Sequence, residues 1–269
     1  MEKRKKTLLR ICISAGSLLF LLLLALLLQL LSSPGIPQNP YPPADYRWED
    51  GLLTCTKGQA LPGIDVSQHQ GEIDWQQVAD AGIRFVFLRV GNRGYQEGKL
   101  SADKRFEENY AGARAAGLKV GAYFFSQAIS VEEAQEEALF ALELLEGKTL
   151  ELPLVFDWEY VSAEARTAAV SGKMLTDCTL AFCRAVETAG FRSMIYFNKS
   201  QALQQLQLRR LRDYPMWLAM YDTSMTFPYR VDCWQYSNTG SIPGIGGSVD
   251  LNLLYTQWGI GKELFDAEK

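Results

Sequence analysis

Four acidic side chains stand at or near the ends of predicted apolar strands. Two of them, Asp157 and Glu159, flank a single tryptophan. Residues two apart in a strand point to the same face, so these carboxyl groups project together. Two carboxyl groups held close in a partly desolvated site cannot ionise with equal ease, and one stays protonated beside an ionised partner. The spacing therefore predicts a proton donor and an anion side by side.

The other two acids belong to the first and the last predicted strands. Asp65 lies in the run 63–67 (GIDVS), and Asp250 lies in 249–252 (VDLN). A lone aspartate is more often a helix cap or an ion-pair partner, but four acids near the ends of four apolar strands are hard to explain that way. Glycoside hydrolysis needs one group that protonates the leaving oxygen and another that stabilises or attacks the cationic sugar centre. The candidate catalytic residues are Asp65, Asp157, Glu159 and Asp250.

Aromatic and polar side chains gather at the same strand ends. Sugars have apolar faces that pack on flat rings, while their hydroxyl groups need hydrogen-bonding partners. Each aromatic residue taken alone is more often part of a core than a sugar platform. The candidate substrate-binding residues are Arg89, Tyr123, Tyr196, Trp217 and Gln235.

A repeated pattern indicates the elements that position these residues. A helix ending in Ala-Gly, then an apolar residue, a basic residue and a strand, recurs at 81–84, 116–119 and 189–192. Glycine that ends a helix ahead of a buried run is typical of the junction between a helix and a strand. Strands that alternate with helices indicate an α/β fold, a parallel TIM-like β/α barrel with its active site at the carboxyl ends of the strands.

Eight strands are expected in this barrel. The connections 222–232 and 238–248 carry no helical pattern, so we expect the barrel to be irregular on its carboxyl-terminal side. The expected strands are 63–66, 85–90, 120–126, 152–159, 193–198, 216–221, 233–237 and 249–253.

The beginning of the chain has a different composition. Residues 1–10 are basic, and residues 11–31 form an uncharged apolar run. At about 1.5 Å per residue, this run just crosses a hydrocarbon core of about 30 Å. A cleaved signal peptide is the alternative, but its apolar region usually spans about 7–15 residues and ends in a small-residue site that is missing here. We expect a single transmembrane anchor with residues 1–10 in the cytoplasm.

The remainder is expected to lie outside the cell membrane. Residues 32–46 hold half of the ten prolines, which favours an extended spacer. Residues 47–269 have the length of one domain. With 27 basic and 31 acidic residues, the chain is a poor match for nucleic acid. A single histidine and no C-x-x-C pair argue against a zinc site. We expect Cys178, Cys183 and Cys233 to pack in the core, and a disulfide at Cys55 stays open.

The strand motifs together resemble glycoside hydrolase family 25, the Chalaropsis-type lysozymes. The matching runs are 63–67 with Gly71 and 74–75, 156–159 (FDWE), 234–236 (WQY) and 249–252, in order within 62–255. The resemblance implies a flattened β/α barrel without metal or cofactor. It also implies N-acetylmuramidase activity on peptidoglycan, at the β-1,4 bond from N-acetylmuramic acid to N-acetylglucosamine.

Residue roles also follow from the resemblance. Glu159 corresponds to the general acid, and Asp157 to the group beneath the reacting sugar. Asp65 and Asp250 correspond to the other two cleft acids, and Tyr123, Trp217 and Gln235 fall at substrate-side positions. The family often carries histidine after this tyrosine, where the present chain has Phe124 and Phe125. The main alternative is a non-catalytic wall-binding module, which would keep the aromatic cleft but could lose the acid pair.

Overall fold

The computed structural model describes residues 35–49 and 51–267 of the chain. The expected basic segment 1–10, the expected anchor 11–31 and the start of the expected spacer lie outside the described residues. Within the described ranges, no helix is long and apolar enough to cross a membrane. The chain divides into two compact units, 1–36 and 37–269, and the second unit holds the barrel.

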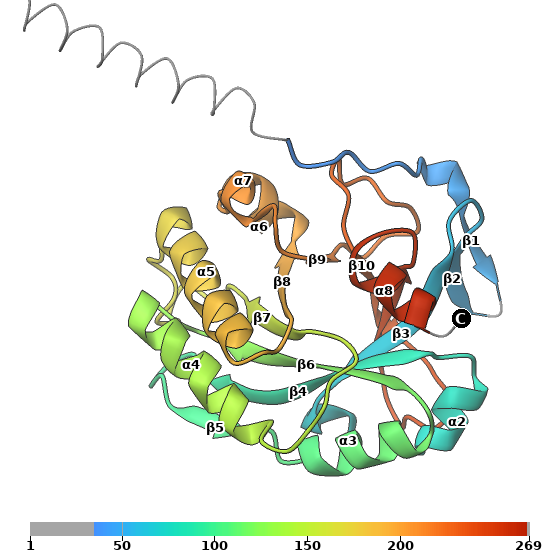
Figure 1. Ribbon diagram of the computed structural model, residues 1–269, viewed down its shortest axis with the longest axis horizontal. Coiled ribbons are helices and arrows are strands. Elements are labelled where there is room, and N and C mark those ends of the chain that lie inside the picture. Colours follow the sequence, from blue (N-terminus) through green and yellow to red (C-terminus); the bar gives the residue numbers. More distant parts are fainter. Residues whose placement is uncertain (1–34, 50, 268–269) are drawn as a thin grey trace, which may run out of the picture. The chain divides into compact units, whose positions relative to one another are not determined.

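Eight strands close into a barrel, as the sequence predicts (Figure 1). A ninth short strand, β5 (Leu100–Ala102), pairs antiparallel with the outer end of β4. In order around the barrel, with β11 pairing back to β3, the strands are β3 (Ala60–Val66), β4 (Phe85–Arg93), β6 (Lys119–Ser126), β7 (Leu154–Trp158), β8 (Ser193–Asn198), β9 (Met216–Ala219), β10 (Cys233–Gly240) and β11 (Val249–Tyr255).

The direction of β11 corrects the expectation of an all-parallel barrel. β11 runs antiparallel to both of its neighbours, β10 and β3, whereas the other barrel strands are parallel to one another. A parallel neighbour needs a crossover of about a dozen residues or more, and the non-helical connection 241–248 is too short for one. The reversal brings Asp250, at the amino end of β11, to the mouth where the carboxyl ends of the other strands lie.

Helices cover the outside of the barrel (Figure 1). The two longest, α4 (Val131–Leu144) and α5 (Gly172–Thr188), lie against each other. The side chain of Asp74 accepts a hydrogen bond from the backbone of Gln77 at 3.1 Å and so caps the helix that begins at Trp75. The helices are α2 (Trp75–Asp80), α3 (Phe106–Ala115), α4 (Val131–Leu144), α5 (Gly172–Thr188), α6 (Lys199–Gln204), α7 (Leu208–Leu211) and α8 (Gly259–Ala267), with the 3-10 turns η1 (Pro43–Asp45) and η2 (Gln68–Gln70).

Aromatic rings fill the barrel and form the floor beneath the site. The ring of Phe87 stacks on Trp217 at a centroid distance of 4.6 Å, and Phe85 packs edge-on against Phe87. Gly63 makes room for this floor, since a Cβ atom at that position would lie 2.3 Å from the ring of Phe85.

The described part of the chain contains four cysteines, which are all buried and free: Cys55, Cys178, Cys183 and Cys233. The core positions expected for Cys178, Cys183 and Cys233 are therefore confirmed.

The second half of the expected spacer belongs to the domain. The backbone of Pro37 accepts a hydrogen bond from Arg230, and Tyr41 stacks on both Tyr255 and Trp258 at 5.7 Å. A two-stranded antiparallel sheet follows, made by β1 (Tyr46–Glu49) and β2 (Leu52–Cys55). The spacer boundary expected at residue 46 is therefore too late. Proline content alone could not reveal this packing, because the stacking partners of Tyr41 lie at the other end of the chain.

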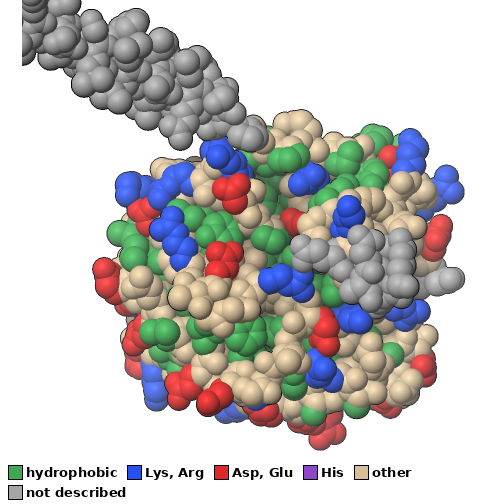
Figure 2. Space-filling model, in the orientation of Figure 1, with side chains coloured by type: hydrophobic (Ala, Val, Ile, Leu, Met, Phe, Trp, Pro, Cys, Tyr) green, Lys and Arg blue, Asp and Glu red, His purple; other side chains and the backbone are tan. Residues whose placement is uncertain are grey.

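Charged side chains of both signs are interspersed over the face shown in Figure 2. This agrees with the near balance of the whole sequence, in which acidic residues are in slight excess. The visible face therefore has no strong electrostatic preference for a polyanion.

Candidate active site

One cavity at the barrel mouth, with a volume of about 250 Å³, brings together all nine site residues predicted from the sequence. They come from each of the eight barrel strands and from the residue that follows β7. The full lining is Asp65, Ser67, His69, Gln70, Arg89, Tyr123, Phe125, Asp157, Glu159, Tyr196, Trp217, Tyr221, Gln235 and Asp250.

The acid pair stands at the end of β7. Asp157 lies within the strand opposite Phe125 of β6, and only 5% of its surface is exposed. Glu159 is the first residue after the strand and is only partly buried. Both carboxyl groups line the cavity, and the charge of Glu159 acts on Asp157. Trp158 points away from them and donates from its indole to the carbonyl oxygen of Ala128 at 3.0 Å, so the predicted same-face arrangement of the acids is confirmed.

Burial makes this pair retain a proton. It raises the pKa of Asp157 well above its usual range, and the charges of Glu159 and Asp65 add to the effect while Arg89 opposes it. Burial also raises the pKa of Glu159, with Asp65 adding to the shift and Asp157 opposing it. One proton is therefore shared by the two acids, and the titration belongs to the pair and not to either residue. The cavity thus offers both a carboxylic acid and a carboxylate.

Asp65 and Asp250 form a second coupled pair across the β3–β11 ladder. Asp65 Oδ1 accepts hydrogen bonds from Gln235 Nε2 at 2.9 Å and from Asn252 Nδ2 at 2.7 Å, which oppose the rise in its pKa caused by burial. Burial and then the charge of Asp65 raise the pKa of Asp250 to about 9. Asp65 is therefore the anion of this pair, and Asp250 is the neutral acid.

Arg89 is the arginine that faces these acids. Its Nε donates to Asp103 Oδ2 at 2.8 Å, and the same carboxylate accepts from the backbone of Gln68 and Arg105, each at 3.0 Å. Asp103 thereby fixes the charge of Arg89 beside Asp157. Sequence reasoning missed Asp103, because it follows the exposed strand β5 and carries no apolar motif that would mark a strand end.

The aromatic wall of the cavity consists of Tyr123, Tyr196, Trp217 and Tyr221. Three of these side chains donate hydrogen bonds to the amides that hold Asp65. Tyr196 and Tyr221 both donate from their hydroxyl groups to Gln235 Oε1, at 2.9 and 3.2 Å. Trp217 packs edge-on against Tyr196 with ring centroids 4.9 Å apart, and its indole donates to Asn252 at 2.8 Å. Tyr221 is 54% exposed, so its ring is available to a ligand.

The predicted site set also omits residues of the loop after β3. Ser67, His69 and Gln70 line the cavity, and the side chain of Ser67 caps the turn η2 by accepting from the backbone of His69. The Gly-Ile-Asp-Val-Ser motif carries a signal for them, since it places this loop directly after a strand that holds one of the acids. In the described part of the chain, His, Cys, Asp and Glu side chains form no group suited to a metal ion.

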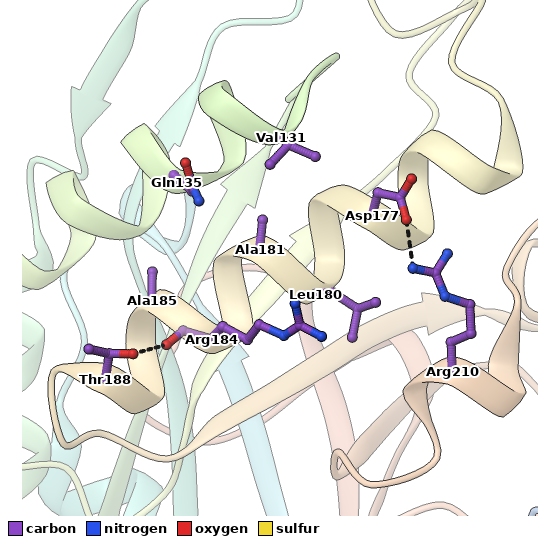
Figure 3. A pocket seen from close by; sticks show the side chains of 9 residues that line it. All are labelled: Val131, Gln135, Asp177, Leu180, Ala181, Arg184, Ala185, Thr188 and Arg210. Carbon is purple, nitrogen blue, oxygen red and sulfur yellow. Dashed lines mark hydrogen bonds and ion pairs between the residues drawn. The ribbon is translucent and has the colours of Figure 1, made fainter.

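A larger hollow of about 420 Å³ lies on the outside of the barrel, along α4 and α5 (Figure 3). The acid in its lining, Asp177, is hydrogen-bonded to Lys173 and Arg210, each at 2.7 Å, and these contacts lower its pKa. A carboxylate held in its charged form by two cations is a poor proton donor. The chemistry of the lining, and not the volume, therefore distinguishes the cavity at the barrel mouth.

Comparison with known proteins agrees with this geometry. Residues 64–245 match the family described as "Glycosyl hydrolases family 25". The chain belongs to this family. It is thus a glycoside hydrolase, and the matched range includes Asp65, Asp157 and Glu159 but ends before Asp250.

Two relatives illustrate the similarity of this family 25 member to individual proteins. "Uncharacterized protein YegX" of Escherichia coli is 30% identical over 205 residues, which cover 72% of this chain and 69% of that protein. "Lysozyme M1" of Streptomyces globisporus is 28% identical over 203 residues, covering 71% of this chain and 67% of that protein.

Among solved structures, the fold resembles the modular autolysin LytC from Streptococcus pneumoniae, solved in complex with a synthetic peptidoglycan ligand. The TM-score is 0.66 at 24% identity, and the match covers 82% of this chain. The family 25 chain spans about half of that autolysin, 52% of its length.

Proposed function

We propose that the chain is a lysozyme, an N-acetylmuramidase that cleaves the β-1,4 bond between N-acetylmuramic acid and N-acetylglucosamine in peptidoglycan. The observation that carries this proposal is the pair of acids Asp157 and Glu159, which line the same aromatic-lined cavity at the barrel mouth and whose pKa values are both raised. Family membership supports the reaction class. The name of the Streptomyces globisporus relative and the peptidoglycan ligand of the pneumococcal autolysin support the substrate.

Glu159 acts as the general acid in this mechanism. It is the more exposed member of the pair, so its carboxyl group can reach the glycosidic oxygen of a bound strand. The proton moves from Glu159 to that oxygen as the bond from the anomeric carbon breaks. Water then supplies a hydroxyl group to the anomeric carbon, and its remaining proton returns to Glu159.

Asp157 supports the reacting sugar from below. Its Oδ1 is buried and has no hydrogen-bond partner among the described residues, so it is available to the 2-acetamido group or to the cationic ring. A fixed negative charge at this position stabilises the positive charge that develops on the sugar ring only in the transition state. Asp65 and Asp250 orient the substrate and tune the pair through their charges, while Arg89 limits the rise in the pKa of Asp157.

Substrate binding uses the aromatic wall. The partly exposed ring of Tyr221 offers a flat surface to one sugar face, and Tyr123, Tyr196 and Trp217 surround the reacting ring. Gln235 holds the hydroxyl groups of two of these tyrosines, so it sets the shape of the subsite.

The same proposal includes a membrane anchor at residues 11–31, with the enzyme domain outside the cell membrane. It is supported by the basic residues 1–10 and the uncharged apolar run that follows them. Such an anchor would confine cutting to wall strands within reach. Expression of the tagged full chain, cell fractionation and mass spectrometry of the mature amino terminus test it. A membrane-bound chain that keeps residues 3–10 supports the anchor, and a released chain that begins after residue 31 contradicts it.

Product analysis tests the activity. Purified peptidoglycan is digested with the protein, the new reducing ends are reduced with borohydride, and the products are identified by mass spectrometry. Muramitol ends are the expected result. Glucosaminitol ends would identify a different glycosidase, and an undigested wall that still binds the protein would identify a non-catalytic module.

A further inference from the structure

A side chain at the end of the neighbouring strand β6 donates a hydrogen bond to the backbone of Glu159. β7 ends at Trp158, whose register partner on β6 is Ser126, so Glu159 lies one residue beyond the paired segment. The amide of Gln127, the residue that follows β6, donates from Nε2 to the Glu159 carbonyl oxygen at 2.8 Å and to the Ser126 carbonyl oxygen at 2.9 Å. Gln127 therefore extends the pairing of β6 and β7 by one residue with its side chain.

The orientation of this amide is fixed by a second buried side chain. Thr167 donates from Oγ1 to Gln127 Oε1 at 3.1 Å, and the two residues are 1% and 0% exposed. The oxygen of an amide can only accept hydrogen bonds and the nitrogen can only donate them. Thr167 donates to the oxygen of the Gln127 amide, and two backbone carbonyl groups accept from its nitrogen. The amide of Gln127 therefore has one favourable orientation.

The backbone of Gln127 contacts two ion pairs, of which one is buried and the other is partly buried. Its N–H donates to Glu137 Oε1 at 3.3 Å, and its carbonyl oxygen accepts from Arg166 Nη1 at 2.9 Å. Glu137 pairs with Arg93 at 2.7 Å, and Arg166 makes a bidentate pair with Glu133 at 2.6 and 2.7 Å. Arginine–carboxylate hydrogen bonds, bidentate ones above all, fix the relative orientation of the two side chains as well as stabilising them.

These side chains stand outside the cavity. Neither Gln127 nor Thr167 is among the residues that line it, and neither are the members of the two ion pairs. Burying several charged and polar groups costs free energy that well-packed apolar residues would avoid. A role in fixing the end of β7, where the acid pair stands, gives this arrangement a function that core stability alone does not.

We propose that Gln127 is a positioning residue for Glu159, and that Thr167 acts with it by fixing the orientation of the amide. The proposal rests on the proposed function, in which Glu159 protonates the leaving oxygen. Proton transfer requires hydrogen-bond reach of about 2.6–3.2 Å, and a displacement of about 1 Å can cost about 10²-fold in rate. Releasing the Glu159 carbonyl would allow such a displacement.

The test replaces Gln127 by methionine, which keeps the length and volume and removes the amide. We expect kcat on purified peptidoglycan to fall about 10–100-fold, while KM changes by less than about threefold because the sugar contacts lie elsewhere. Thr167→Val is the second variant, with an expected loss of about 3–10-fold. Its matched control is Thr179→Val in α5, where a similarly buried hydroxyl group donates to Leu175 at 2.8 Å; this change should leave kcat unaltered.

The pH profile separates positioning from general loosening of the fold. A released Glu159 gains solvent, so the alkaline limb of kcat should move to lower pH in Gln127→Met and Thr167→Val but not in Thr179→Val. The charged and titratable groups that face Glu159 stay unchanged in all three variants; they are Asp65, Asp157, Tyr196, Tyr221 and Asp250.

The outcomes distinguish this proposal from the activity on which it rests. An unaltered kcat per folded molecule and an unaltered alkaline limb in both variants, with an active wild type, would overturn the positioning role alone. A change confined to KM or to the melting temperature would overturn that role as well. A wild type that releases no muramic reducing ends would instead overturn the proposed function.

Discussion

Asp65 and Asp250 face each other as register partners across the antiparallel strands β3 and β11, although one lies in the first barrel strand and the other in the last. Gln235 and Asn252 donate to Asp65, whereas Asp250 is kept neutral by burial and by the charge of Asp65. The two aspartates therefore differ in charge at neutral pH. Substitution by asparagine should affect them differently.

Asp250→Asn keeps a neutral, hydrogen-bonding group and should lower kcat by less than about tenfold. Asp65→Asn removes the anion whose charge raises the pKa of both Asp157 and Glu159, and it should lower kcat by about 10²-fold. Initial rates on purified peptidoglycan measure both effects, with circular dichroism to confirm folding. Equal losses, or a larger loss for Asp250→Asn, would contradict the assigned charges.

Stability should decrease as pH rises through the neutral range. The pKa of Asp250 is raised from 3.8 to about 9, so between these values the folded state binds more protons than the unfolded state, and the free energy of unfolding falls with pH. Buried Glu137, whose pKa is raised to about 7, adds to the same trend. Melting temperatures from pH 4 to pH 9 should show the fall, and Asp250→Asn should reduce its slope. An identical slope in the variant would be inconsistent with a neutral Asp250.

The segment before β1 should contribute to stability but not to catalysis. Tyr41 stacks on Tyr255 and Trp258 at the end of the barrel opposite the mouth, because Tyr255 pairs with Ala60 at the start of β3. Tyr41→Ala should lower the free energy of unfolding by about 1–3 kcal/mol, and kcat per folded molecule should stay unaltered. Tyr41→Phe keeps the ring and serves as the control. Chemical denaturation measures the difference, and equal stability of the alanine variant would show that the stacking contributes nothing.

Much of the barrel can be predicted because its signals are local. Alternation in a strand is enough to put Asp157 and Glu159 on one face, and helix ends marked by Ala-Gly reveal the repeated βα units. The apolar run around Asp65 and the one around Asp250 each indicate a strand without reference to the rest of the chain. The grouping of Asp65, Asp157 and Glu159 at one mouth follows from the fold class, whereas Asp250 reaches this mouth through the reversal of β11.

The features that could not be predicted depend on contacts between distant segments. The only sequence signal for the reversal of β11 is the short connection 241–248 that precedes it. Tyr41 lies in a proline-rich run whose composition resembles a spacer, and its partners are near the other end of the chain. The pairing of Arg89 with Asp103 and the contact of Gln127 with Glu159 join side chains that no sequence period relates.

Asp157→Asn should be nearly as damaging as loss of the general acid. The variant keeps the shape of the side chain but removes the charge beneath the reacting sugar, so we expect kcat to fall by about 10²–10³-fold with little change in substrate binding. Asp177→Asn, which alters a partly exposed aspartate in the ion pairs of α5, is the matched control. If Asp157→Asn turned over peptidoglycan at the rate of this control, the pair on β7 would not be the catalytic unit.

The most direct test of the acid pair is the rate at which Glu159→Gln releases muramic reducing ends from purified peptidoglycan, measured beside the wild type and the exposed loop variant Glu164→Gln. Glutamine keeps the shape of the side chain and cannot donate the proton. We expect Glu159→Gln to be folded, to bind the glycan still and to be slower by about 10²–10⁴-fold, while Glu164→Gln matches the wild type. A Glu159→Gln protein that is free of other muramidases and retains near wild-type turnover would contradict the role of Glu159 as the general acid.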